Sequence, residues 1–121
     1  MEETTVSFER KGVVSVWVFC EPVNPADARK DVLKEMCGVD YYDLDFQSAM
    51  SEETLTPLHA LIEPLSYSES FIEEAIKAAQ RLGIANALEV IAQYDFAYDP
   101  RKVTKPIAKD PVFIGYFHWH D

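Results

Sequence analysis

The chain has no long apolar run, which argues against a membrane-spanning helix. No run reaches the roughly 18 residues that cross a bilayer, and the acidic, polar start at Met1–Thr5 has no signal-peptide pattern. Cysteine is also scarce: Cys20 and Cys37 form no C-x-x-C pair, which favours reduced thiols over a disulfide framework. We therefore expect a cytoplasmic protein that has no membrane partner.

Catalytic and phosphate-binding motifs are missing as well. The chain has four glycines, and they form neither a phosphate-binding loop nor a G-x-S-x-G nucleophile elbow. No H-E-x-x-H motif is present, and no nucleophile stands beside a base. The main expectation is therefore a binding protein that is not an enzyme and uses no cofactor.

Positive charge is absent from the middle of the chain. Residues 1–34 carry six acids and five bases, and residues 77–121 carry five acids and six bases. Residues 35–76 carry ten acids and no lysine or arginine, so this segment holds the whole net charge of −10. Nucleic acid is not an expected partner, because binding it needs a basic surface. An acidic surface suits a basic partner or serves solubility alone, and both interpretations remain open.

What the chain does contain is enough apolar sequence for one core. Apolar residues make up 48% of the 121 residues, which predicts one domain over residues 1–121 with a single core of ordinary size. Gly115 lies inside an apolar segment and predicts either a bulge or a close approach of another backbone there. The segments rich in β-branched and aromatic residues, which predict buried strands, are Val13–Phe19, Leu88–Phe96 and Val112–Trp119.

Two helices are predicted between these strands. Asn24 and Pro25 cap and start the first helix, which ends at Gly38. The second begins in the serine-rich stretch 66–70, where two capping-box patterns occur, and ends at Gly83. Its predicted apolar face comprises Phe71, Ile72, Ala75, Ile76, Ala79 and Leu82.

The remaining segments are less regular. Residues 40–57 are polar and poorly periodic, which predicts an irregular connection, and Leu58–Leu65 fits either a short helix or a strand. The order strand, helix, irregular segment, helix, strand, strand predicts an α+β fold. In this fold a small, mostly antiparallel sheet packs against two main helices.

The segment Val39–Phe46, VDYYDLDF, combines three carboxylates with three aromatic rings. It does not fit a calcium loop, because the glycine that the EF-hand turn requires is missing. If the segment were extended, Tyr42, Leu44 and Phe46 would share an apolar face that anchors it. The opposite, acidic face would be available to a basic partner, with a purely structural role as the alternative. The predicted contact surface comprises Asp40, Tyr41, Asp43, Asp45, Glu52 and Glu53.

Two further functions compete with this one. Two histidines and a carboxylate can ligate zinc or iron, so His118, His120 and Asp121 are the candidate ligands of a small metal-binding protein or enzyme. The apolar stretch VFIGYFHW at Val112–Trp119 could instead be an exposed pairing edge of a self-associating structural or regulatory protein. The oligomeric state, monomer or dimer, stays open.

Five motifs occur together in an order and spacing that are typical of a known family. They are VSVWV at Val14–Val18, DLDF at Asp43–Phe46, SYSESFIEEAIKAAQRLGI at Ser66–Ile84, YDFAY at Tyr94–Tyr98 and FIGYF at Phe113–Phe117. In this combination the chain resembles the bacterial immunity protein 22 family over roughly residues 13–119.

The resemblance implies an α+β protein that is encoded beside a secreted polymorphic toxin. Such a protein binds and neutralises the cognate toxin domain in the cytoplasm of the producing cell, and the toxins are often nucleases. A nuclease must attract phosphate, so its active-site surface is usually basic. The acidic middle of this chain suits such a partner, and the charge distribution and the resemblance therefore predict the same kind of interface.

Overall fold

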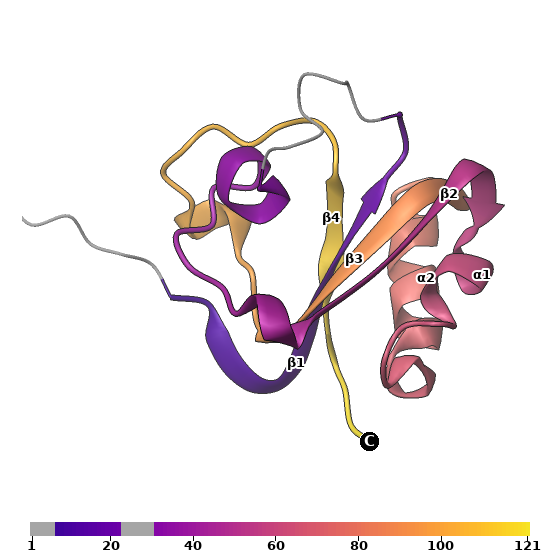
Figure 1. Ribbon diagram of the computed structural model, residues 1–121, viewed down its shortest axis with the longest axis horizontal. Helices are drawn as coiled ribbons and strands as arrows, with labels where there is room; N and C mark the ends of the chain where they lie inside the picture. Colours follow the sequence, from indigo (N-terminus) through magenta and orange to yellow (C-terminus); the bar gives the residue numbers. More distant parts are fainter. Residues whose placement is uncertain (1–6, 23–30) are drawn as a thin grey trace, which may run out of the picture.

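Four antiparallel strands form a sheet through the centre of the molecule (Figure 1). The computed structural model describes residues 7–22 and 31–121. The strands are β1 (Glu9–Phe19), β2 (Gln47–Pro57), β3 (Asn86–Phe96) and β4 (Val112–His118). Their order in the sheet is β2-β3-β1-β4, so β2 and β4 are the edges. The predicted α+β fold is confirmed, and its three predicted strands correspond to β1, β3 and β4.

The prediction of an irregular connection over residues 40–57 is wrong from Gln47 onward, where β2 begins. β2 pairs with β3 from Gln47 opposite Gln93 to Ser51 opposite Glu89, and the register then shifts before Thr56. Most of its side chains are exposed. An edge strand with little buried surface needs no apolar alternation, and the sequence therefore carried no strand signal here.

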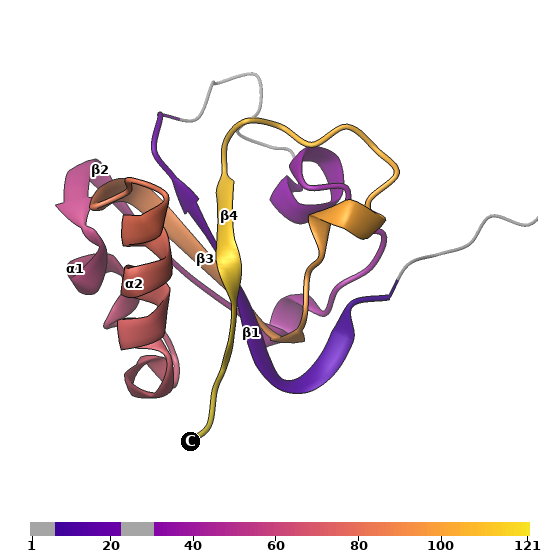
Figure 2. The ribbon, with the colours of Figure 1, turned by 180° about the vertical axis from the view of Figure 1, so that it is seen from behind.

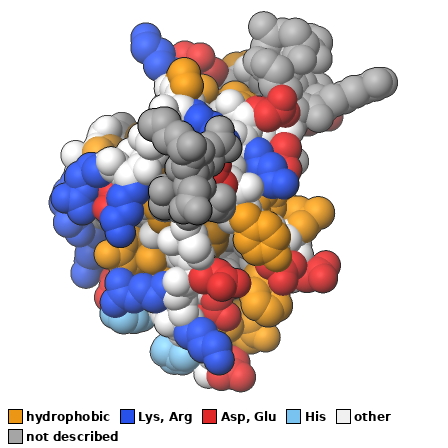
Figure 3. Space-filling model, turned by 90° about the vertical axis from the view of Figure 1, so that its left-hand side faces the viewer, with side chains coloured by type: hydrophobic (Ala, Val, Ile, Leu, Met, Phe, Trp, Pro, Cys, Tyr) orange, Lys and Arg blue, Asp and Glu red, His pale blue; other side chains and the backbone are white. Residues whose placement is uncertain are grey.

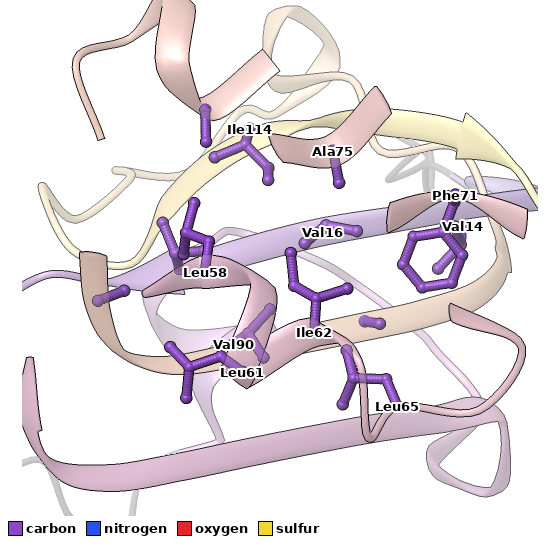
Figure 4. Close-up of a cluster of buried hydrophobic side chains, with 14 of the residues drawn as sticks. Val14, Val16, Leu58, Leu61, Ile62, Leu65, Phe71, Ala75, Val90 and Ile114 are labelled. Carbon is purple, nitrogen blue, oxygen red and sulfur yellow. The ribbon is translucent and has the colours of Figure 1, made fainter. Parts of the chain in front are cut away.

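Two helices cover one face of the sheet, α1 (Leu58–Ile62) and α2 (Ile72–Arg81) (Figures 1 and 2). The open choice for residues 58–65 is thus settled in favour of a short helix. Side chains at alternate positions of the strands point toward the helices and fill the space beneath them (Figure 4). This core includes Val14, Val16, Val90, Leu61, Ile62, Phe71, Ala75 and Ile114.

The opposite face of the sheet is also covered. Trp17 and Phe19 of β1 and Ile91 of β3 pack there in a second core, which contains Leu33 and Cys37 from the segment after residue 31. Because both faces of β1 are covered, every residue from Val13 to Phe19 is buried. This explains why the β1 sequence from Val13 to Phe19 is apolar at every position except Ser15 rather than alternating.

The start of the first predicted helix, at Asn24 and Pro25, lies outside the described residues. The described end of this segment is η2 (Val32–Met36), a single π-helical turn whose N-cap is Asp31. Gly38 follows with a φ of +72°, so it ends the turn in the left-handed conformation as predicted.

The predicted capping boxes of the second helix are wrong. α2 begins at Ile72 without a side-chain cap, because the serines before it form η4 (Ser68–Ser70), a separate 3-10 turn. The hydroxyl of Ser70 donates to a carbonyl within that turn. Gly83 ends the helix as predicted, but Leu82 is exposed because the chain leaves the helix at this residue. No helix among the described residues is long and apolar enough to cross a bilayer.

Candidate binding surface

The segment that precedes β2 bends instead of running extended, so the predicted alternation of faces is wrong. Leu44–Phe46 form η3, a 3-10 turn. Asp43 caps this turn, because its carboxylate accepts from the backbone N–H of Asp45 at 3.0 Å. Aspartate stabilises such turns by mimicking a backbone acceptor. As a result Leu44 is 66% exposed and Phe46 is 49% exposed, and neither anchors the segment in the core.

Polar contacts hold this segment to the N-cap of η2 and to the sheet. The hydroxyl of Tyr42 donates to both carboxylate oxygens of Asp31 at 2.9 Å. Gln93 is buried in β3. Its side-chain Nε2 donates to the backbone carbonyl of Asp43 at 2.7 Å. Its side-chain Oε1 accepts from Nε2 of Gln47 at 3.1 Å. Burial, followed by the contact with Asp31, raises the pKa of Tyr42 to about 12.

A first groove of about 320 Å³ lies between this segment and the central strands. Tyr41 and Asp43 line one side, and Arg10 and Lys11 at the start of β1 line another. The acidic segment therefore faces basic residues that are distant in the sequence, and the charge around this groove is mixed.

A second groove of about 310 Å³ shares Phe46, Tyr94 and Asp95 with the first. It runs toward Tyr67, just before η4, and Trp119, just after β4. Among the described residues its lining contains two carboxylates and four aromatic rings but no lysine or arginine. The residues that line it are Asp45, Phe46, Gln47, Ser66, Tyr67, Tyr94, Asp95 and Trp119.

A bulge between the two central strands places Asp95 where the grooves meet. The pairing of β1 with β3 shifts register between Glu9 and Val14, opposite Phe96 and Tyr94. Asp95 lies at this shift with a φ of +54°, and its carboxylate accepts from the backbone N–H of Gly12 at 3.0 Å. The left-handed conformation interrupts the alternation along β3, so Tyr94 and Phe96 belong to cores on opposite faces of the sheet.

Three aromatic rings form a cluster along the second groove. The ring of Tyr67 lies 4.9 Å from that of Trp119, which lies 5.3 Å from Tyr94. The hydroxyl of Tyr94 donates to the carbonyl of Ser66, and the backbone N–H of Trp119 donates to Gly12 at 3.0 Å. The indole nitrogen of Trp119 is buried and has no hydrogen-bond partner in the described part of the chain.

The structure divides the predicted contact residues into separate groups. Tyr41 is 59% exposed beside the first groove, and Asp45 lines the second. Asp40 forms an ion pair with Lys105 at 2.8 Å, which offsets part of its charge. Glu52 and Glu53 are exposed on β2, roughly 20–23 Å along the strand from the end of η3 at the usual rise per residue.

Sequence reasoning assigned none of three groove residues, Tyr67, Asp95 and Trp119, to the contact surface, and it favoured a turn acceptor for Asp95. Tyr67 and Asp95 are the two non-glycine residues with positive φ in the described ranges, and both line the second groove. No local pattern indicated them, because the groove is assembled from four segments that are remote in sequence. Strained conformations of this kind are typical of functional sites.

The C-terminal metal candidates do not gather into a site. His118 is exposed on β4, and the backbone of His120 donates to the Ser70 hydroxyl at 3.1 Å. Within residues 7–22 and 31–121, no group of three His, Cys, Asp or Glu side chains is arranged to hold a metal ion.

The apolar C-terminal strand is an edge of the sheet, as the self-association hypothesis requires. Its pairing with β1 shifts register at Ile114, because Val16 lies opposite Gly115 and Trp17 opposite Phe113. This confirms the predicted bulge, a feature that hinders edge-to-edge pairing. Self-association through β4 stays a prediction.

The surface charge is patterned more finely than the sequence suggested. On the face in Figure 3, hydrophobic and acidic side chains are intermixed on the right, and most lysine and arginine side chains lie on the left.

Comparison of the chain with protein-family models, curated proteins and solved structures gives no match. The resemblance to the immunity protein 22 family therefore stays a prediction.

Proposed function

We propose that the chain is an immunity protein that binds and neutralises a cognate toxin domain, a nuclease, in the cytoplasm. The observation that carries this proposal is the combination of exposed aromatic rings and carboxylates around the two grooves. Tyr41, Phe46 and Tyr67 are each about half exposed or more, and Asp43, Asp45 and Asp95 lie among them.

These two kinds of side chain supply different parts of a protein interface. Tyrosine and phenylalanine bury a large area at low entropic cost, and a few such anchors provide most of the binding energy. Carboxylates attract a basic partner and raise its association rate to as much as about 10⁸–10⁹ M⁻¹s⁻¹ at low salt. A nuclease, whose substrate is polyanionic, offers the matching basic surface.

The first experiment is binding to the C-terminal domain of a large secreted protein that is encoded beside this chain, at two salt concentrations. Asp45→Lys is expected to weaken binding about tenfold or more, mainly through slower association at low salt. Tyr41→Ala is expected to weaken binding to a similar degree through faster dissociation at both salt concentrations.

Two matched control variants test whether the contact surface is where we place it. Glu52→Lys makes the same charge change on the distant part of β2, and Tyr116→Ala removes a ring that is 45% exposed on β4. Each is expected to change the affinity less than threefold. Equal losses in the site and control variants would place the interface elsewhere, and no binding by a folded partner domain would contradict the proposed function.

A further inference from the structure

We infer that the second groove is a binding site for a cationic side chain, the guanidinium of an arginine on the partner protein. This inference deepens the proposed function, on which it rests for the nature of the partner. It identifies the chemical group that the groove accepts and the residues that accept it.

The lining of the groove has the composition that binds an organic cation. Asp45 and Asp95 supply two carboxylates, and the described lining contains no lysine or arginine to neutralise them. Phe46 and Tyr67 are about half exposed, so ring surface is available to a ligand. A cation over an aromatic face is attracted by the ring quadrupole, and the attraction grows when the site is partly desolvated.

The floor of the groove is held in place before any ligand arrives. Tyr94 is 6% exposed and packs against Trp119, whose backbone donates to Gly12. Gly12 in turn donates to Oδ1 of Asp95, and no other described donor bonds to that carboxylate. One of its oxygens therefore remains for a ligand, and a rigid site of this kind loses little entropy on binding.

No lysine or arginine of the described residues occupies this site. The cation–π contact found among the described residues joins Arg10 to Tyr116, 5.8 Å from the ring centre, on β4 rather than in the second groove. The nearby first groove contains Arg10 and Lys11. The first groove therefore repels an incoming cation more than the second groove does, because the described lining of the second groove contains no lysine or arginine.

Arginine fits this groove better than lysine does. Its guanidinium is planar, so one face stacks on a ring while the N–H groups at its edge donate to carboxylates. The volume of about 310 Å³ lies at the lower end of the range for small-molecule sites. A single long side chain is thus a better match than a larger ligand.

The test titrates the whole chain with N-acetyl-arginine amide and follows the two indole N–H signals by NMR. The protein has two tryptophans, Trp17 and Trp119, and Trp17 is buried on the opposite face of the sheet. The Trp119 signal, assigned with a Trp119→Phe variant, is expected to shift saturably with a dissociation constant on the order of 10 mM. The neutral isostere N-acetyl-citrulline amide is expected to cause no such shift.

Isosteric variants then test the two carboxylates. Asp95→Asn removes the charge but keeps an acceptor for Gly12 and tolerates the left-handed conformation, and it is expected to weaken arginine binding about two- to fivefold. Asp45→Asn is expected to do the same. The matched control is Asp110→Asn, because Asp110 likewise accepts a backbone N–H, from Cys20 at 3.0 Å, at the other end of β1. It is expected to leave binding unchanged.

Two outcomes overturn the inference: equal shifts with arginine and citrulline, or no saturable shift of the Trp119 signal with either. The titration uses no toxin, so it separates the inference from the proposed function. If arginine binds but no toxin domain does, the groove assignment stands and the proposed function fails. If the toxin domain binds wild type and Asp95→Asn equally and arginine does not bind, the function stands and the inference fails.

Discussion

Tyr41 and Tyr42 are neighbours in the sequence, but their side chains lie in different surroundings. Tyr41 is 59% exposed, whereas the hydroxyl of Tyr42 donates to the Asp31 carboxylate that caps η2. Tyr42 therefore holds in place the segment on which Tyr41 is exposed. An alternating pattern of aromatic and acidic residues cannot separate these roles, because the bend at η3 decides which side chains face inward.

The same substitution at these two positions should have different effects. Tyr42→Phe removes hydrogen bonds to a carboxylate and is expected to lower the free energy of unfolding by about 1.5 kcal/mol. Tyr41→Phe is expected to change it by less than about 0.5 kcal/mol. Urea denaturation of both variants measures the difference, and equal values would show that the contact with Asp31 adds no stability.

Ser15 is a buried polar residue whose hydroxyl connects two backbone groups. It donates to the carbonyl of Phe96 at 2.6 Å and accepts from the N–H of Tyr98 at 2.9 Å. Ser15→Ala would leave both groups buried without this partner, so we expect a loss of about 2–4 kcal/mol in denaturant unfolding. Ser51→Ala, on exposed β2, is the control and should cost less than about 0.5 kcal/mol. A cost for Ser15→Ala as small as that of the control would contradict this role.

At the scale of elements, two glycines end helical segments with similar backbone geometry but different neighbours. Gly38 and Gly83 have φ values of +72° and +79°. A Cβ on Gly38 would overlap Cγ1 of Val103, whereas no atom of the described residues lies within 4 Å of a Cβ on Gly83. The two positions therefore separate the cost of the left-handed conformation from the cost of a steric overlap.

Alanine at these positions provides the test. Gly83→Ala is expected to cost about 1–2 kcal/mol, the penalty of the left-handed conformation alone. Gly38→Ala adds the overlap with Val103 and is expected to cost about 2–5 kcal/mol in the same denaturation measurement. Equal costs would mean that the contact of Gly38 relaxes without loss of stability.

The sequence predicted correctly the elements that depend on local chemistry. It did not predict the elements that depend on contacts with other segments. β1 and β3 are central strands that are rich in apolar residues, and Gly83 marked the end of α2. β2 was missed because it is an exposed edge. The start of α2 was misplaced because Ser68 and Ser70 lie in a separate 3-10 turn, where their hydroxyls donate to the carbonyls of Glu63 and Tyr67 and do not cap the helix.

At the scale of the whole molecule, several weak acids are buried in their protonated form. Burial is the main cause that raises the pKa of Cys37 and of Tyr94 to about 12, and it also raises the pKa of Tyr98. In the unfolded chain these groups ionise at about pH 8.5–10. Above that range the unfolded state loses protons that the folded state keeps.

The sign of this linkage predicts loss of stability in alkali. The stabilising contribution is complete below about pH 8.5 and falls as the pH rises toward 12, by at most about 1.4 kcal/mol per pH unit for each buried group. Denaturant unfolding at about pH 8 and pH 10.5 should show this decrease, and Tyr94→Phe should reduce it. A free energy of unfolding that is constant across the interval would contradict the prediction.

The sequence by itself determined the fold class, the central strands, the net charge and the acidic middle of the chain. These properties follow from composition and from the spacing of apolar residues along single elements. Only the tertiary structure decided which residues form the candidate site. The second groove combines Asp45, Tyr67, Asp95 and Trp119 from four distant segments, and a bulge between β1 and β3 places Asp95 within it. Sheet register and loop packing bring these residues together, and both depend on contacts between segments that no local pattern encodes.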